Sequence, residues 1–493
     1  MPKDNGIQGQ AQPEKTVHIP PGASLEEGPQ KPPPTVREIL DILKKQVQKV
    51  NLETELGEGW KQKHLIVFVV ERVLEVAKAN GWNLARQNDF VYLFTGKHWQ
   101  VIDKDILKRF LADCTIQLGY SPRESRYYEF QDKLFRQFLT EAYLPPPQPD
   151  LNRVLVNLQN GTFEVTQDGF HLREHNPDDF LTHLLPFPYK SHWKAPRFSR
   201  YLEQVLPDEA ARNVLAEFFG YVFTRKLKLE KALLLYGSGA NGKSVFFDVI
   251  NAMLGRENVV TYSLSSLSEE HNRAMIANAL LNYGSEISGA GVNRDTFKAL
   301  VSGEPIQARL KYGNPFIMEN YAKLAFNANE LPKDVEHNEA YFRRFLIVPF
   351  AVTIPEADRN PMLAQQIIED ELPGVFNWVM EGLARLLENN KFSSCTLVEA
   401  ALAQYRKESD SVALFIEEPE TYYQPTNPDT DKDKWKTLAS LFSEYREFCT
   451  ASGFRAVSVR NFSERLQGLK FQTVKRKQGK IVFCQKGELD GEG

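Results

Sequence analysis

One stretch constrains the fold of this chain more than any other: Leu233-Leu-Leu-Tyr-Gly-Ser-Gly-Ala-Asn-Gly-Lys-Ser244. A short apolar run, typical of a buried strand, leads into a glycine-rich turn, and residues 245–254 then have the apolar spacing of a helix. The segment from Gly237 to Ser244 fits the pattern G-x-x-x-x-G-K-[ST] at every fixed position. A strand, a glycine-rich loop and a helix in this order predict an α/β domain with a mostly parallel sheet.

The residue types in this loop favour binding of a nucleotide phosphate. Glycines permit backbone conformations in which successive N–H groups point at one anion, and the positive end of the following helix dipole adds to that field. We expect Lys243 to reach the β- and γ-phosphates and Ser244 to hold Mg²⁺. The phosphate-binding residues are therefore predicted to be Gly237, Ser238, Gly239, Ala240, Asn241, Gly242, Lys243 and Ser244.

Composition limits the class of protein. The chain has 493 residues, of which 42% are hydrophobic and 25% charged, as in soluble globular proteins of several domains. The longest apolar run, Leu65–Val70, is too short to cross a membrane, and four widely spaced cysteines argue against a zinc ribbon or a disulfide framework. These features predict a protein of the reducing cytoplasm without a membrane partner. The net charge of −4 means that any nucleic-acid binding must come from local patches.

The order of expected elements divides the chain. Strands alternate with helices only around the phosphate loop, hairpin signals such as Asn160-Gly161 lie before it, and a helix–helix–hairpin pattern closes the chain. The fold class is predicted to be α/β, with a P-loop ATPase core between smaller domains. The expected segments are a disordered tail (1–34), an α+β domain (35–195), a helical collar for oligomerisation (196–230), the ATPase core (231–395), a connecting helix and linker (396–435), a winged-helix domain (436–486) and a tail (487–493).

An ATPase also needs an acid, a sensor of the γ-phosphate and a cation for the transition state. Glu286, just past the expected strand 280–283, is the candidate acid, as a magnesium ligand or as a base for the attacking water; Ser285 stands where a second carboxylate could be. Asn329 is the candidate sensor, with Asn327 as the near alternative. Arg343 and Arg344 precede a buried strand, and we expect one of them to act as an arginine finger in a neighbouring subunit.

Two further stretches have the composition of nucleic-acid contacts. Residues 298–316 predict a helix and then a β-hairpin whose tip presents Lys311 and Tyr312, a cation and an aromatic suited to a phosphate backbone and to base stacking. Residues 455–480 contain eight Lys or Arg against one acid, Glu464. On a winged helix, this positive charge would bind the phosphate backbone of duplex DNA. The DNA-binding residues predicted from these stretches are Lys311, Tyr312, Arg460, Lys475, Arg476 and Lys477.

Because of these motifs, residues 196–352 resemble a superfamily III helicase of the phage and plasmid primase–helicase type, which is related to the poxvirus primase–helicase. The similarity rests on segments 236–244, 280–286, 302–311, 326–332 and 343–350 in the family's order. Thr95-Gly-Lys-His-Trp99 and Tyr405-Arg-Lys-Glu-Ser-Asp410 extend it to most of residues 90–485. Many relatives carry a primase domain upstream, whereas only a short tail and a helix are expected before residue 60 here. No carboxylate cluster on the expected strands suits polymerisation.

The resemblance implies an AAA+ core in a hexameric ring that hydrolyses ATP with Mg²⁺ and unwinds DNA, usually 3′ to 5′. Single-stranded DNA would occupy the ring channel and duplex DNA the winged helix, with priming by a separate primase or polymerase. The expected setting is replication of a phage, plasmid or other mobile element in the cytoplasm of a bacterium or phage-infected host. The alternative is an origin-binding initiator or loader ATPase that assembles on DNA without processive unwinding. A GTPase is disfavoured, because the chain lacks an N-K-x-D guanine signature.

Overall fold

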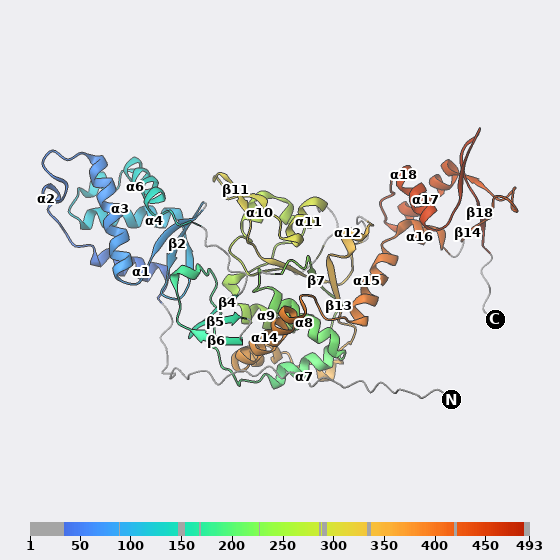
Figure 1. The fold of residues 1–493 in the computed structure, drawn as a ribbon, viewed down its shortest axis with the longest axis horizontal. Coiled ribbons are helices and arrows are strands. Elements are labelled where there is room, and N and C mark those ends of the chain that lie inside the picture. Colours follow the sequence, from blue (N-terminus) through green and yellow to red (C-terminus); the bar gives the residue numbers. More distant parts are fainter. Residues whose placement is uncertain are drawn as a thin grey trace, which may run out of the picture.

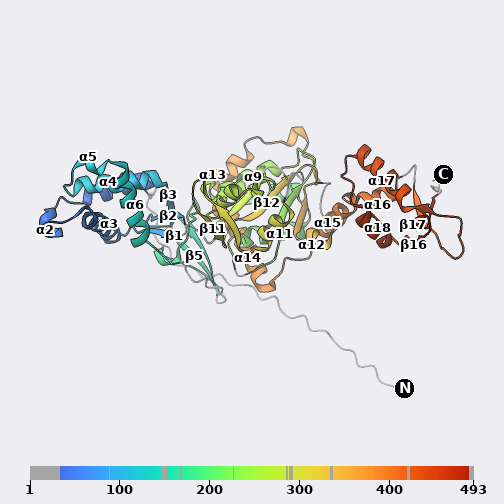
Figure 2. The same ribbon diagram turned by 90° about the horizontal axis from the view of Figure 1, so that it is seen from above.

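The computed structural model describes residues 34–87, 89–145, 153–166, 169–225, 227–284, 287, 293–332, 337–418 and 422–487. These residues form three bodies in a row, with an N-terminal helical region at one end, the central sheet and its helices in the middle, and a small C-terminal module at the other end (Figures 1 and 2). The predicted tails lie outside the described residues apart from residues 34 and 487.

The N-terminal region packs four main helices beside a small antiparallel sheet. The helices are α1 (Val36–Gln46), α3 (Gln62–Ala79), α4 (Lys104–Gln117) and α6 (Tyr128–Glu141), with short α2 (Leu52–Leu56) and α5 (Pro122–Ser125) between them. The sheet has the order β1 (Leu84–Gln87), β2 (Phe90–Phe94), β3 (Trp99–Ile102). Both α1 and α4 are capped at their N-termini, since Thr35 forms a capping box with Glu38 and Asp103 accepts hydrogen bonds from the first turn of α4.

A second antiparallel sheet follows, formed by β4 (Val154–Leu158), β5 (Gly161–Thr166) and β6 (Gly169–Arg173), as the turn signals predicted. Its apolar face does not join the N-terminal helices. Val156, Phe163 and Phe187 pack in the same hydrophobic core as the collar helices and the phosphate-loop helix. Residues 35–195, which the sequence interpretation placed in one domain, therefore contribute to two different cores.

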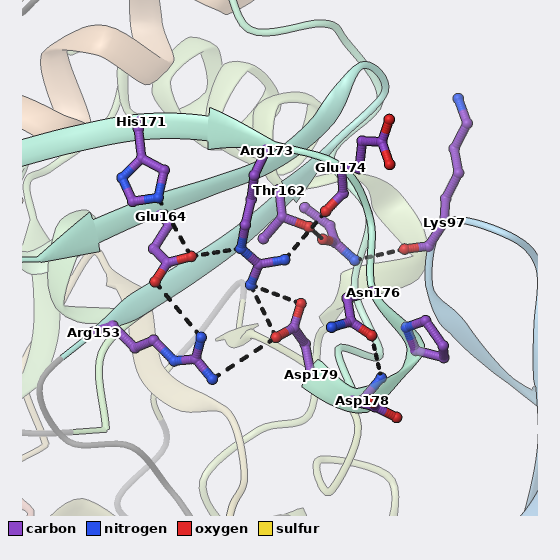
Figure 3. Close-up of polar contacts among 12 residues, drawn as sticks. Lys97, Arg153, Thr162, Glu164, His171, Arg173, Glu174, Asn176, Asp178 and Asp179 are labelled. Atoms are coloured by element: carbon purple, nitrogen blue, oxygen red, sulfur yellow. Dashed lines mark hydrogen bonds and ion pairs between the residues drawn. The ribbon is translucent and has the colours of Figure 1, made fainter.

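An ion-pair cluster fixes the turn after this second sheet (Figure 3). Arg173 on β6 donates to Glu164 on β5 at 2.5 Å and to Asp179 in the short helix η1 (Pro177–Asp179) at 2.9 Å. Arg153 lies 3.6 Å from the other oxygen of Glu164. Burial alone would raise the pKa of Glu164, but the charges of Arg173 and Arg153 outweigh it and hold that pKa below its ordinary value.

The collar consists of α7 (Pro196–Val205) and α8 (Glu209–Tyr221), and α8 packs along α14 (Leu372–Asn389). Two glycines permit this close approach. A Cβ on Gly382 would lie 2.2 Å from the carbonyl carbon of Ala216, and a Cβ on Gly220 would lie 2.7 Å from the backbone of Leu383. Any larger residue at either position would push the two helices apart, so the glycines set the spacing of the collar against α14.

The central sheet is parallel throughout, as predicted, and has the order β13-β7-β12-β9-β8. Its strands are β7 (Ala232–Tyr236), β8 (Val259–Val260), β9 (Leu281–Gly284), β12 (Lys323–Ala328) and β13 (Phe345–Pro349). Along β7, Leu233 and Leu235 face the core shared with α8, α9 (Lys243–Leu254) and α14, whereas Ala232 and Leu234 face the opposite core. Burial on both faces explains why these strands are continuously apolar rather than alternating.

The opposite face of the sheet carries shorter elements and a hairpin. The hairpin pairs β10 (Ile306–Arg309) with β11 (Pro315–Met318), as predicted from the turn at residues 312–315. The remaining elements of the core are η2 (Arg256–Asn258), η3 (Ser266–Ser268), α10 (Glu270–Ala274), α11 (Arg294–Ser302), α12 (Glu339–Phe342), η4 (Glu356–Asp358) and α13 (Leu363–Asp370).

The C-terminal module is connected to the central body by α15 (Thr396–Glu408). It contains α16 (Ser411–Ile416), α17 (Leu438–Ser452) and α18 (Val459–Gly468), and a sheet in the order β15 (Lys436–Thr437), β17 (Gly479–Val482), β16 (Thr473–Arg476). A separate pair joins β14 (Tyr423–Pro425) to β18 (Cys484–Lys486). Part of the expected linker therefore pairs with a strand near the end of the described chain.

Candidate nucleotide-binding site

The phosphate loop lies between the carboxyl end of β7 and the start of α9. Its backbone adopts positive φ at Gly239 (111°), Ala240 (49°) and Gly242 (85°), conformations that L-residues rarely adopt. The loop is fixed at both sides, because Gly237 N donates to Ala328 O on β12 at 3.0 Å and Ile354 N donates to Ala240 O at 2.9 Å. The first turn of α9 has no side-chain cap, so its backbone N–H groups are available to an anion.

Two of the glycines, Gly237 and Gly242, are required for space, and Gly242 also for its positive φ. A Cβ on Gly237 would lie 2.1 Å from Asn241 Nδ2, and a Cβ on Gly242 would lie 2.7 Å from Val205 Cγ1 of the collar. The pattern G-x-x-x-x-G is thus matched by close packing in the structure, and the loop cannot accept a larger residue at either end.

Lys243 lies inside the loop and is only 7% exposed. Its ammonium donates to Gly237 O and to Asn241 Oδ1, the latter at 3.1 Å, and burial lowers its pKa. Asn241 Nδ2 in turn donates to Phe350 O at 2.9 Å, so one amide links the lysine to the end of β13. Ser244 is exposed at the first turn of α9. A buried cation, an uncapped helix start and an exposed hydroxyl suit a phosphate chain with a bound Mg²⁺.

The candidate acid follows β9, which ends at Gly284; Glu286 and Ser285 lie outside the described residues. The two candidate sensors differ in environment. Asn327 is half-buried on β12 and accepts a hydrogen bond from Tyr283 OH at 3.2 Å. Asn329 is exposed just past the end of β12, where Ala328 is paired with Tyr236 beside the loop. Asn329 is thus at the same sheet edge as the loop and is available to a ligand.

The two arginines lie at the opposite edge of the sheet. They directly precede β13, whose first residue, Phe345, pairs with Ala232 at the start of β7. Four residue steps of β7 separate that pair from Tyr236, a span of about 13 Å. Arg343 is exposed and pairs with Glu230 at 3.0 Å. Arg344 is buried and donates to Ser302 Oγ at 3.1 Å and to Ala340 O. Neither side chain is near the loop of its own chain, and of the two only Arg343 is exposed to a neighbouring molecule.

The hairpin tip presents the predicted pair. Tyr312 is 94% exposed and has φ of 64°, and Lys311 Nζ lies 5.2 Å from the centroid of its ring. The N-terminal sheet contacts the base of this tip, because Asp89 accepts a hydrogen bond from Asn314 N at 3.0 Å. An exposed tyrosine in a left-handed conformation is uncommon, and the turn holds it away from the protein surface.

The basic residues of the C-terminal module are distributed over α18 and the β16–β17 hairpin. Lys475, Arg476 and Lys477 are exposed on the hairpin. Arg460 on α18 pairs with Glu464 at 2.9 Å, so its charge is partly offset. The C-terminal module that carries these residues lies at one end of the molecule, and α15 connects it to the central body that contains the phosphate loop (Figure 1).

Sequence reasoning missed a residue that positions the loop. Tyr201 on α7 donates its hydroxyl to Gly242 O at 2.7 Å, and it is buried in the collar. In the sequence, Tyr201 is one of several apolar positions of an amphipathic helix. No local pattern separates it from a core residue, because the contact depends on how α7 crosses the start of α9.

Comparisons with known proteins give two family matches and distant viral relatives. Residues 72–207 match the family described as "D5 N terminal like", and residues 235–344 match a family of unknown function, DUF5906. These matches confirm the resemblance to primase–helicases of the D5 type. The chain is also 22% identical over 271 residues to "Putative helicase L207/L206" of Acanthamoeba polyphaga mimivirus and 23% identical over 319 residues to "Putative helicase 121R" of Invertebrate iridescent virus 3.

These two matches cover 52% and 57% of this chain but 28% and 34% of the viral proteins, so the chain spans about a third of the length of these relatives or less. Among solved structures, the C-terminal region of NrS-1 is 11% identical with a TM-score of 0.46, covering 84% of this chain and 98% of that one. Within the part of the chain that the structure describes, no helix combines the length and the apolar character needed to span a membrane.

Proposed function

We propose that this chain is an ATP-dependent DNA helicase of superfamily III with an AAA+ core, acting in replication of a phage, plasmid or other mobile element. The single observation that carries the proposal is the position of the two catalytic groups. The lysine loop and the exposed Arg343 lie at opposite edges of one parallel sheet, so Arg343 can reach a nucleotide at the loop only in another copy of the chain. This arrangement supports a closed ring, and we propose a hexamer.

In this proposal, two adjacent copies of the chain supply different residues to one nucleotide site. Lys243 and the loop N–H groups bind the phosphates, Ser244 and Glu286 hold Mg²⁺, and Asn329 orients the attacking water. Mg²⁺ neutralises charge on the β- and γ-phosphates when it is bound. Arg343 of the adjacent copy stabilises the charge that develops on the transferred phosphoryl group. Arg344, buried against Ser302, positions the start of β13.

The hairpin and the C-terminal module are the proposed DNA contacts. Lys311 and Tyr312 project into the ring channel and follow single-stranded DNA, with movement 3′ to 5′. The helices α17 and α18 and the sheet β15-β17-β16 form a winged helix, which binds duplex DNA through Arg460, Lys475, Arg476 and Lys477. A separate primase or polymerase completes the replication machinery.

Strand displacement tests the proposal. The protein is mixed with a forked duplex and ATP, and both unwinding and DNA-stimulated phosphate release are measured for wild type, Lys243→Ala, Lys311→Ala and Tyr312→Ala. Lys391→Ala, which removes an exposed lysine beyond α14, is the matched control. We expect Lys243→Ala to lose both activities and the hairpin variants to lose unwinding. DNA-stimulated ATP hydrolysis without displacement would instead favour the initiator or loader.

A further inference from the structure

A group of cations lies at the sheet edge opposite the phosphate loop. Arg225 and Lys228 belong to the connection between α8 and β7, and Lys323 is the first residue of β12. The strand β12 runs about 16 Å from Lys323 to Ala328, which is the residue that contacts the loop. This group is therefore separate from the nucleotide site.

Lys323 has no carboxylate partner among the described residues. Its ammonium lies 4.0 Å from the centroid of the buried Tyr221 ring. Burial, with repulsion from Arg225 and Lys228, lowers the pKa of Lys323 to about 8. Lys323 therefore has a cation–π contact and two repulsive neighbours but no ion pair, whereas half-buried charges are usually paired with an opposite charge.

Arg225 is also unpaired. It makes no hydrogen bond or ion pair with any described residue, although its side chain keeps solvent-exposed surface. Burial by neighbouring atoms also lowers its pKa. A guanidinium normally pairs with a carboxylate or a phosphate, because its five donors match those planar or tetrahedral oxygen sets.

His183 adds an unused polar atom to the same group. It is 8% exposed, its Nε2 has no hydrogen-bond partner among the described residues, and its ring lies 6.3 Å from that of Phe223, two residues before Arg225. Burial and the charge of Arg225 lower the pKa of His183 to about 3, so the ring is neutral. Glu230, on the same connection as Arg225 and Lys228, is paired with Arg343 at 3.0 Å and lies 3.5 Å from Arg344.

We propose that Arg225, Lys228 and Lys323, with the Nε2 of His183, form a second phosphate-binding site. Uncompensated cations destabilise a folded protein, and an anion that binds between them removes that cost. The ligand is a phosphate group, either a phosphodiester of a nucleic-acid strand or a free phosphate such as that of a nucleotide. The nucleic-acid source rests on the proposed function, whereas the free-phosphate source does not.

The test compares the full-length double variant Arg225→Gln/Lys323→Gln with a charge-matched control, Arg109→Gln/Lys63→Gln, whose residues are exposed on α4 and α3. Fluorescence anisotropy with labelled oligothymidylate, without ATP, measures the nucleic-acid source across a range of salt concentrations. Thermal shifts with pyrophosphate and ATP in a Lys243→Ala background, where the phosphate loop is disabled, measure the free-phosphate source.

For the nucleic-acid source we expect the double variant to bind oligothymidylate about tenfold more weakly, with a salt slope shallower by about two charges, and the control to change less than threefold. For the free-phosphate source we expect pyrophosphate to raise the melting temperature of the Lys243→Ala protein but not of the same protein carrying the double variant. Without any anion, the double variant should melt at the wild-type temperature or above it.

If the double variant keeps both the oligothymidylate affinity and the thermal shift with pyrophosphate, the second site is refuted. A lower melting temperature of the double variant would also overturn it, since the cations would then be structural. If the wild-type chain binds no oligonucleotide, the proposed function fails, and the pyrophosphate measurement still decides whether the site exists.

Discussion

Mixing two inactive variants would show whether one nucleotide site is built from two copies of the chain. Lys243→Ala removes the phosphate-loop lysine, and Arg343→Ala removes the exposed arginine at the other edge of the sheet. Each variant alone should lose ATP hydrolysis, and loss of an arginine finger reduces turnover by about 10³-fold or more in comparable systems.

The size of the recovery follows from the geometry. In a ring assembled from an equal mixture, a site works when its own subunit has Lys243 and the adjacent subunit has Arg343. Each condition is met by half of the subunits, so about one quarter of the sites are intact. We therefore expect an equal mixture to regain about one quarter of the wild-type rate of phosphate release, after dilution and reconcentration to exchange subunits.

A second mixture serves as the control. Lys243 and Asn329 lie at the same edge of the sheet and act in the same copy, so Lys243→Ala mixed with Asn329→Ala should regain no activity. Recovery in both mixtures, or in neither, would refute the assignment of Arg343 to the neighbouring subunit. Full activity of Arg343→Ala alone would refute its catalytic role.

Four further outcomes are expected. Glu164→Gln should lower stability by about 2 kcal/mol at neutral pH, because it removes a mostly buried ion-pair partner; since the pKa of Glu164 is lowered, the deficit should shrink as pH falls below 4.5, as followed by thermal melts. Tyr201→Phe should weaken ATP binding by about three- to tenfold in equilibrium titrations, because the Gly242 carbonyl loses its donor. Lys323→Met should raise the melting temperature near pH 7, and the gain should diminish above pH 8, where the wild-type lysine loses its proton. Reversal of residues 475–477 to glutamate should weaken duplex binding and flatten its salt dependence, whereas an unchanged slope would exclude the hairpin from the interface.

Local patterns were enough to predict the phosphate loop, the parallel sheet and the β10–β11 hairpin. Each depends on residues that are adjacent in the sequence, such as glycines in a turn or a continuous apolar strand. The placement of Arg343 before a buried strand also followed from local order. These features can be predicted from the sequence without knowledge of their tertiary contacts.

Other features depend on distant partners and were missed. The strand β14 lies in a polar segment and exists because its backbone pairs with β18, more than fifty residues later. The sheet β4–β6 looked like part of the N-terminal domain, yet its apolar residues pack against the collar. The contact of Tyr201 with Gly242 and the unpaired cations around Lys323 depend on tertiary approach, which no spacing rule encodes.

The tight approach of α8 to α14 has a mechanical consequence. Gly220 and Gly382 leave no free space between the helices, and Tyr201 at the collar holds the carbonyl of Gly242. We therefore expect the collar, α14 and the start of α9 to move together as one rigid body. In the proposed ring, a rotation imposed on the collar by an adjoining copy would shift the Gly242 carbonyl directly, and assembly would then alter nucleotide binding at the loop.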